Sequence, residues 1–314
     1  MQDDYLRSRG FALTLARRAV EDLRRDEFRQ LRNYVDLCQS LARKTRYSGF
    51  FTKAQQVLQR ADSLYYDLIR CLLDRVDPEC LCNFGVDFGV GGVVHGAAHL
   101  REETERTGQC SAWLNTANFS SPQLEEAVCR AEQAGRYVWV LYAQEKTSLR
   151  TAVEIVKRHP FSAFLLVAEP ELLTSMPPES LDDCGNLCIW ILLPAPDLGP
   201  EPIRAAETLL RHRRLFGFAV LLDDQTAERA LDPEWLQEMA RWASFCLYAC
   251  KPDMGEKTAQ WFRRSVVQSR TESATPLLVF DWDGDLQAVN KGISEQAVVG
   301  TPAGADLPFP FSCS

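Results

Sequence analysis

The chain has 314 residues, of which 46% are hydrophobic and 25% are charged, and this is enough apolar material to bury a sizeable core. Its net charge of −8 argues against a nucleic-acid-binding protein, because such proteins need a concentrated basic face. No apolar run approaches the ~20 residues of a membrane helix, and residues 1–4 are too polar for a signal peptide, so we expect a cytoplasmic protein without a membrane partner.

Residues 1–108 predict a helical region. Apolar residues recur at helical spacing over 31–41 and again over 54–68, and Asp77-Pro78-Glu79 is typical of a helix start with an acidic cap. His95 and His99 are spaced to share a helix face. The glutamate that a zinc protease needs beside the first histidine is a glycine here, so we favour a packing role.

From residue 111 onwards, short apolar runs alternate with amphipathic helices. The runs are continuous rather than alternating, which indicates a parallel sheet covered on both faces, either a barrel or an open wound sheet. The predicted strands are 112–114, 137–141, 161–167, 187–193, 216–222, 245–249 and 277–280. We expect a partial barrel over 109–286 and a partly disordered C-terminal extension over 287–314, with a poorly ordered tail from residue 302.

Chemistry in such folds lies at the carboxyl ends of the strands. The polar residues that follow the predicted strands therefore define a candidate pocket, whose members are Asn115, Thr116, Gln144, Glu145, Glu169, Asp223, Asp224, Lys251 and Asp281. No residue among them can be assigned a catalytic role from the sequence.

Several short segments occur in a characteristic order: 76–79, 84–89, 134–146, 159–170, 216–223 and 248–255. In order and spacing, these segments resemble radical S-adenosylmethionine enzymes, in particular bacterial ones with helices before the barrel. The resemblance spans roughly residues 75 to 285. It implies an α/β fold, a partial (β/α) barrel of the radical S-adenosylmethionine type with a helical N-terminal region.

The chain departs from that family where its chemistry resides. The family holds a four-iron cluster with C-x-x-x-C-x-x-C after the first strand, but residues 115–121 contain no cysteine. Only Glu145 matches the family's Gly-Gly-Glu-Pro turn, and Glu169-Pro170 replaces its Asn-Gly. The resemblance therefore implies the fold and argues against an iron–sulfur cluster and radical chemistry.

Other local patterns do not supply a metal site. The chain has eleven cysteines, and Cys184/Cys188 and Cys246/Cys250 have C-x-x-x-C spacing. The second pair lies along a predicted strand, where four residues span ~13 Å, too far for one metal, and Cys188 also enters a predicted strand. Asp281-Trp282-Asp283-Gly284 resembles the nucleophile loop of haloacid-dehalogenase phosphatases, yet it lies too late in the chain to open such a domain. A structural role for that string is favoured.

Our leading hypothesis is a pseudoenzyme, a binding or partner protein that pairs with an active radical S-adenosylmethionine relative, another protein or a small-molecule ligand. We expect no cofactor, while S-adenosylmethionine and a divalent cation stay open. The alternative is a cluster-independent enzyme with an acidic, divalent-metal-binding pocket formed by Glu145, Glu169, Asp223, Asp224 and Asp281. A third idea is an acidic protein-interaction surface formed by the N-terminal helices, which an exposed apolar patch on residues 1–70 would support.

Overall fold

The computed structural model describes residues 2–43, 46–109, 112–118, 124–294 and 298–300. The tail predicted from residue 302 therefore lies outside the described residues. The N-terminal region is helical, as predicted. Its elements are α1 (Gln2–Arg25), α2 (Glu27–Ala42), α3 (Ser48–Leu58), α4 (Leu64–Arg75), α5 (Pro78–Val86), the π-helical segment η1 (Asp87–Gly96) and α6 (Ala97–Thr107).

A single parallel sheet forms the centre of the molecule. Its strands in the described residues are β1 (Ala112–Asn118), β2 (Val138–Ala143), β3 (Ala163–Ala168), β4 (Leu187–Leu193), β5 (Phe216–Leu222), β6 (Phe245–Cys250), β7 (Leu278–Asp281) and β8 (Val298–Gly300). Their order is β7-β6-β5-β4-β3-β2-β1-β8, so consecutive strands are neighbours and β8 joins β1 at the far edge. The described strands therefore form a curled half-barrel, which resolves the choice between a barrel and an open doubly wound sheet.

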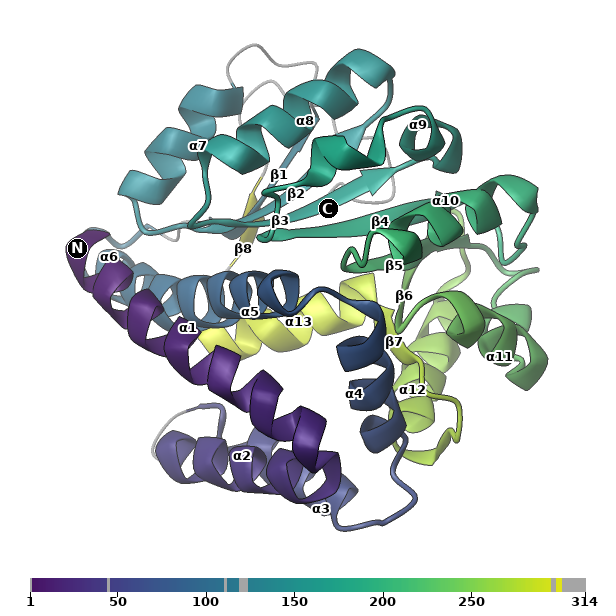
Figure 1. The fold of residues 1–314 in the computed structure, drawn as a ribbon, viewed down its shortest axis with the longest axis horizontal. Helices are drawn as coiled ribbons and strands as arrows, with labels where there is room; N and C mark the ends of the chain where they lie inside the picture. The colour runs from purple at the N-terminus through teal and green to yellow at the C-terminus, as the bar shows by residue number, and fades with distance from the viewer. Residues whose placement is uncertain (1, 44–45, 110–111, 119–123, 295–297, 301–314) are drawn as a thin grey trace.

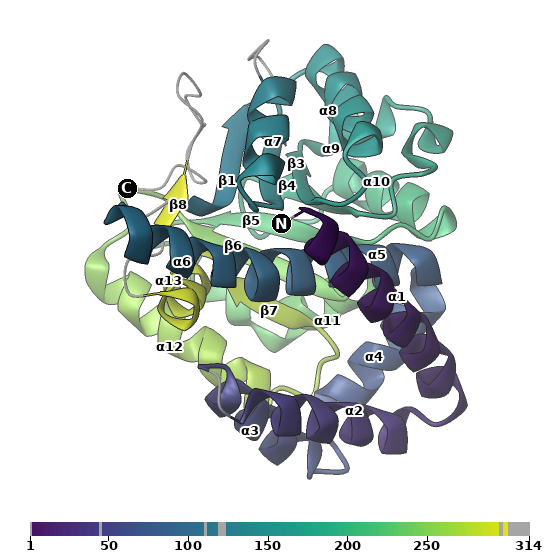
Figure 2. The same cartoon turned by 90° about the vertical axis from the view of Figure 1, so that its left-hand side faces the viewer.

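Helices cover both faces of this sheet (Figures 1 and 2). The outer helices follow the strands and lie together on one face. They are α7 (Leu124–Gln133), α8 (Lys146–Arg158), α9 (Pro170–Thr174), α10 (Pro200–Arg211), α11 (Pro233–Trp242) and α12 (Glu256–Glu272). On the inner, concave face lie α5, η1, α6 and α13 (Trp282–Ile293). The fully buried strands β2 and β4 show why the apolar runs are continuous: each residue faces one of two cores.

The core on the inner face is built from both the strands and the helices laid across them. From β2, β4 and β6 come alternate residues that include Val140, Trp190 and Leu247. The helices supply Leu100 of α6 and Trp282 of α13 to the same cluster. The interior of the half-barrel is thus filled with packed side chains.

Glycine lets η1 approach the sheet closely. A Cβ atom on Gly92 would lie 2.3 Å from a methyl carbon of Val138 at the start of β2. No side chain fits at that distance, so Gly92 is needed for this segment to pack against the strand, whereas Gly85 and Gly89 have open space around them. The wide π-helical turn lies in the same stretch.

Helix α1 is tied to this assembly by a buried ion pair. The Arg9 guanidinium donates to both carboxylate oxygens of Asp87 on η1, at 2.5 and 3.0 Å, and also to the carbonyl of Pro160 at 3.2 Å. Tyr5 donates to the carbonyl of Phe161 at 2.9 Å. Because Pro160 and Phe161 directly precede β3, these bonds connect α1, η1 and the amino edge of the sheet.

Several predicted boundaries are wrong. The apolar pattern over 54–68 belongs to two helices, α3 and α4, separated by residues 59–63. The first strand does not end at residue 114, because β1 continues to Asn118. The strand series does not close at residue 280 either: α13 extends to Ile293 and β8 pairs with β1. Part of the predicted C-terminal extension therefore completes the sheet.

Candidate functional site

The first two predicted pocket residues lie within a strand rather than in a loop. Asn115 and Thr116 belong to β1 and are buried. The Asn115 amide nitrogen is 3.5 Å from the carbonyl oxygen of Val138 on the neighbouring strand. The predicted loop over residues 115–121 is therefore a strand up to Asn118, and residues 119–121 lie outside the described residues.

The loops after β2 and β3 carry the next three candidates. Gln144, Glu145 and Glu169 are exposed. Glu145 is the residue before α8, and its backbone N–H donates to the Ser148 hydroxyl at 3.0 Å. Glu169 occupies the equivalent position before the short helix α9. Both glutamates start helices at the surface.

Two aspartates after β5 are bound to the loop after β6. The Lys251 ammonium donates to Asp223 at 2.9 Å, and this hydrogen bond, with one from Thr226, lowers the pKa of Asp223 to about 2. Asp224 accepts the Gly255 N–H at 3.1 Å. These contacts fasten two neighbouring loops at the carboxyl edge, and the Asp223 carboxylate is already paired with a cation.

The last candidate, Asp281, lies in a separate cluster at the carboxyl ends of β6 and β7. Ligand atoms of Cys250, Asp281 and Asp283 lie within 4.8 Å of one another, and within the described ranges this is the one group of three such side chains. Arg263 of α12 faces both aspartates, with nitrogen–oxygen distances of 3.7 Å to Asp281 and 3.8 Å to Asp283. Those distances are too long for hydrogen bonds.

Asp281 is an unusually placed carboxylate. Its side chain is 4% exposed, and burial raises its pKa to about 6 even though the Gly284 N–H and Arg263 favour the charged form. Its Oδ1 atom is buried and makes no hydrogen bond within the described structure. A Cβ atom on Gly284 would lie 2.3 Å from the other oxygen, so glycine is needed for the backbone to approach this carboxylate.

The third aspartate of the string has a different role. Asp285 forms a two-pronged ion pair with Arg270 at 2.8 and 2.5 Å and accepts the backbone N–H of Asp281 at 2.9 Å. It therefore fixes the junction between β7 and α13. Asp281 and Asp283 share Arg263 as their neighbouring cation, at distances longer than a hydrogen bond.

The contacts within the described residues bring some of the candidate pocket residues together. The structure joins Asp223 to Lys251 and places Asp281 beside Cys250 and Asp283, two residues absent from the predicted set. A signal for Cys250 existed: it ends β6, the strand next to β7, and Tyr248 is in register with Asp281. Sequence spacing along β6 does not reveal that Cys250 lies near Asp281, because the two residues are on neighbouring strands.

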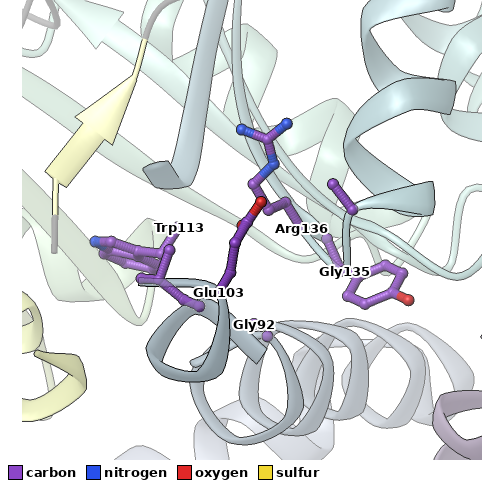
Figure 3. A pocket seen from close by; sticks show the side chains of 9 residues that line it. Gly92, Glu103, Trp113, Gly135 and Arg136 are labelled. Atoms are coloured by element: carbon purple, nitrogen blue, oxygen red, sulfur yellow. The ribbon is translucent and has the colours of Figure 1, made fainter. Parts of the chain in front are cut away.

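Two small hollows lie away from this cluster. The one in Figure 3 is between α6 and the amino ends of β1 and β2, lined by residues that include Gly92, Glu103, Trp113 and Arg136. The other lies between α9 and α10. Each has a cavity volume of about 10 Å³, room for about one water molecule. The hollow at the amino edge lies where barrels of this kind carry structural rather than catalytic residues.

Comparisons with known proteins add no relative. No protein-family model, curated protein or solved structure matches the chain. Within the part of the chain that the structure describes, every helix is too short or too polar to cross a membrane.

Proposed function

We propose that this chain is a non-catalytic protein on a degenerate radical S-adenosylmethionine-like half-barrel, and that it acts by binding another protein. The packing of the inner face carries the proposal. A cofactor and substrate inside a half-barrel would need open space on this face. Here Trp190 and Leu247 from the sheet pack with Leu100 and Trp282 from helices, which leaves the interior filled.

The sequence of the first loop supports the same proposal. Residues 115–121 contain no cysteine, so the three thiolates that hold a radical-generating cluster are missing from that loop. Glu145, the one residue that matches the family's second motif, starts a helix at the surface. Neither loop supplies cofactor chemistry.

Surface chemistry favours a protein partner over a small molecule. Of nine large apolar side chains that are exposed among the described residues, five lie on the first three helices, α1 to α3: Phe11, Leu15, Phe28, Leu37 and Phe50. Phe11 and Phe50 are about 70% exposed, at 70% and 68%. Where exposed apolar side chains form a contiguous patch, that patch is typical of surfaces that contact other proteins.

Anaerobic reconstitution with iron and sulfide tests the catalytic part of this proposal. We expect no stoichiometric four-iron cluster in the purified chain and no saturable heat on titration with S-adenosylmethionine. A cluster with four irons per chain, or saturable binding of that cofactor, would overturn the proposal.

Partner binding needs its own experiment. Cross-linked complexes from the native cell, identified by mass spectrometry, should contain a stoichiometric protein partner that the double substitution Phe11→Ser/Phe50→Ser removes. Val267→Ser is the matched control, because Val267 is similarly exposed, at 62%, but lies on α12. Equal loss of the partner in the control would contradict a role for the N-terminal helices.

A second candidate function is a cluster-independent enzyme at the carboxyl ends of the strands. One observation favours it: the buried Asp281 lies beside Cys250 and Asp283. The wider acidic pocket does not contribute, since Glu145 and Glu169 are exposed. The hypothesis that the chain is an enzyme therefore depends on this three-residue cluster alone.

A further inference from the structure

We propose that Cys250, Asp281 and Asp283 form a binding site for a divalent transition-metal ion of the Zn²⁺ class. This inference is independent of partner binding and of the family resemblance. It starts from backbone geometry: β6 and β7 are parallel neighbours, and the register that pairs Tyr248 with Asp281 brings the end of β6 alongside the start of α13. The sheet and helix thus hold one thiol and two carboxylates together.

The spacing of the three ligand atoms suits a small ion. They lie within 4.8 Å of one another. Around a tetrahedral Zn²⁺ with bonds of ~2.0–2.3 Å, such atoms are separated by about 3.3–3.5 Å. The ligand atoms would therefore have to approach one another by about 1 Å to bind one ion, a shift that rotation of the side chains would have to supply.

The site contains a buried carboxylate oxygen that a metal ion could bind. The Asp281 side chain is only 4% exposed, and its Oδ1 atom is buried without a hydrogen-bond partner among the described residues. Buried carboxylate oxygens are normally paired, and leaving one unpaired is costly. Asp285 cannot share this role, because Arg270 and the Asp281 backbone occupy both of its oxygens.

Arg263 compensates the charge only in part. Its nitrogens are 3.7 and 3.8 Å from Asp281 and Asp283, and its side chain is 37% exposed. Its Nε atom has no hydrogen-bond partner in the described part of the chain. It can therefore turn outward when a cation enters. The path is open as well, because Cys250 and Asp283 are only partly buried.

The donor set indicates which metals fit. A thiolate with two carboxylates suits Zn²⁺ or Co²⁺, while Mg²⁺ and Ca²⁺ prefer oxygen ligands alone. On binding, the Cys250 thiol releases its proton to solvent and its sulfur forms the bond to the metal. Three protein ligands leave a fourth tetrahedral position for water.

Titration of the metal-free, untagged full chain with Co²⁺ tests the proposal, because thiolate coordination produces a charge-transfer band in the near ultraviolet. We expect saturation at one Co²⁺ per chain, competition by Zn²⁺ and none by Mg²⁺. Cys250→Ser should remove the band, and Asp281→Asn should weaken binding at least about tenfold because a charged ligand is lost. Cys129→Ser, a partly buried cysteine on α7, is the matched control and should keep the band.

Loss of binding in the other variants could also result from misfolding. Arg263→Gln distinguishes the two, because it should raise the affinity for Co²⁺. Removing a competing positive charge next to a divalent cation should tighten Co²⁺ binding at least about tenfold. Unsaturable Co²⁺ binding, a band that persists in Cys250→Ser, or an affinity unchanged in Arg263→Gln would each overturn the proposal.

Discussion

Replacing Arg9 by methionine leaves the Asp87 carboxylate buried without its cation. The Asp87 side chain is 0% exposed and that of Arg9 10% exposed, and the guanidinium makes two charge-assisted hydrogen bonds to it. Breaking one side of such a buried pair costs about 3–5 kcal/mol of unfolding free energy. We expect Arg9→Met to destabilise the protein by that amount at pH 8, measured by urea unfolding followed by tryptophan fluorescence.

The pH dependence follows from the pKa of Asp87. Burial raises this pKa above its ordinary value, and Arg9 opposes the shift, so removing Arg9 raises the pKa further. A carboxyl group whose folded pKa is raised disfavours the folded state once it ionises, and the penalty disappears as pH falls below the folded and unfolded pKa values. The loss in Arg9→Met should therefore be largest at pH 8 and shrink towards pH 4.

Two further variants distinguish the effect of the unpaired Asp87 charge from the effect of any substitution in helix α1. Arg9→Met/Asp87→Leu removes both charges and should recover most of the lost stability, because no unpaired charge is left. Arg17, on the same helix as Arg9, forms an exposed ion pair with Glu79 of α5, and Arg17→Met should change stability little. A loss below 1 kcal/mol in Arg9→Met, or an equal loss at both pH values, would refute the reasoning.

Two more predictions concern packing. Gly92→Ala should lower the unfolding free energy by about 1–3 kcal/mol, because its Cβ would collide with β2. Gly85→Ala, at an exposed position of helix α5 with open space around it, should instead stabilise the protein by about 0.5–1 kcal/mol in thermal unfolding. Equal effects at both glycines would contradict the close approach. Cys246, whose thiol pKa burial raises to about 12, should resist a thiol-labelling reagent until the chain unfolds, while the partly buried Cys129 reacts earlier. Mass spectrometry of labelled peptides distinguishes them, and early labelling of Cys246 would show that the sheet opens locally.

The sequence was most informative where burial is uniform. Continuous apolar runs predicted β2 to β6 because both faces of each strand are covered, and Asp77 was correctly predicted to cap α5, where it accepts the N–H groups of Glu79 and Cys80 at 2.9 and 3.3 Å. The prediction of β1 stopped early because Asn115 and Thr116 are polar, although both are buried in the strand. β8 was not predicted, because a strand of three residues is too short to show a hydrophobic pattern. It forms by pairing with β1.

The candidate site shows a different limit. Its aspartate was predicted, since Asp281 follows an apolar strand in sequence. Cys250 and Arg263 were not, because their nearness to Asp281 depends on the order of strands and on how α12 lies against them. Sequence spacing reports neighbours along one element, whereas this cluster is formed by three elements that meet only in the fold.

The bonds of α1 have a consequence for how the chain folds. Tyr5 and Arg9 find their partners Phe161 and Pro160 more than 150 residues later, with separations of 156 and 151. During synthesis the N-terminal helices therefore emerge long before the sheet on which they pack, with their apolar faces uncovered. Contacts of such long range are slow to form and are made late. We expect the first hundred residues to be the part of the nascent chain that most needs shielding, and α1 to be the last helix to dock.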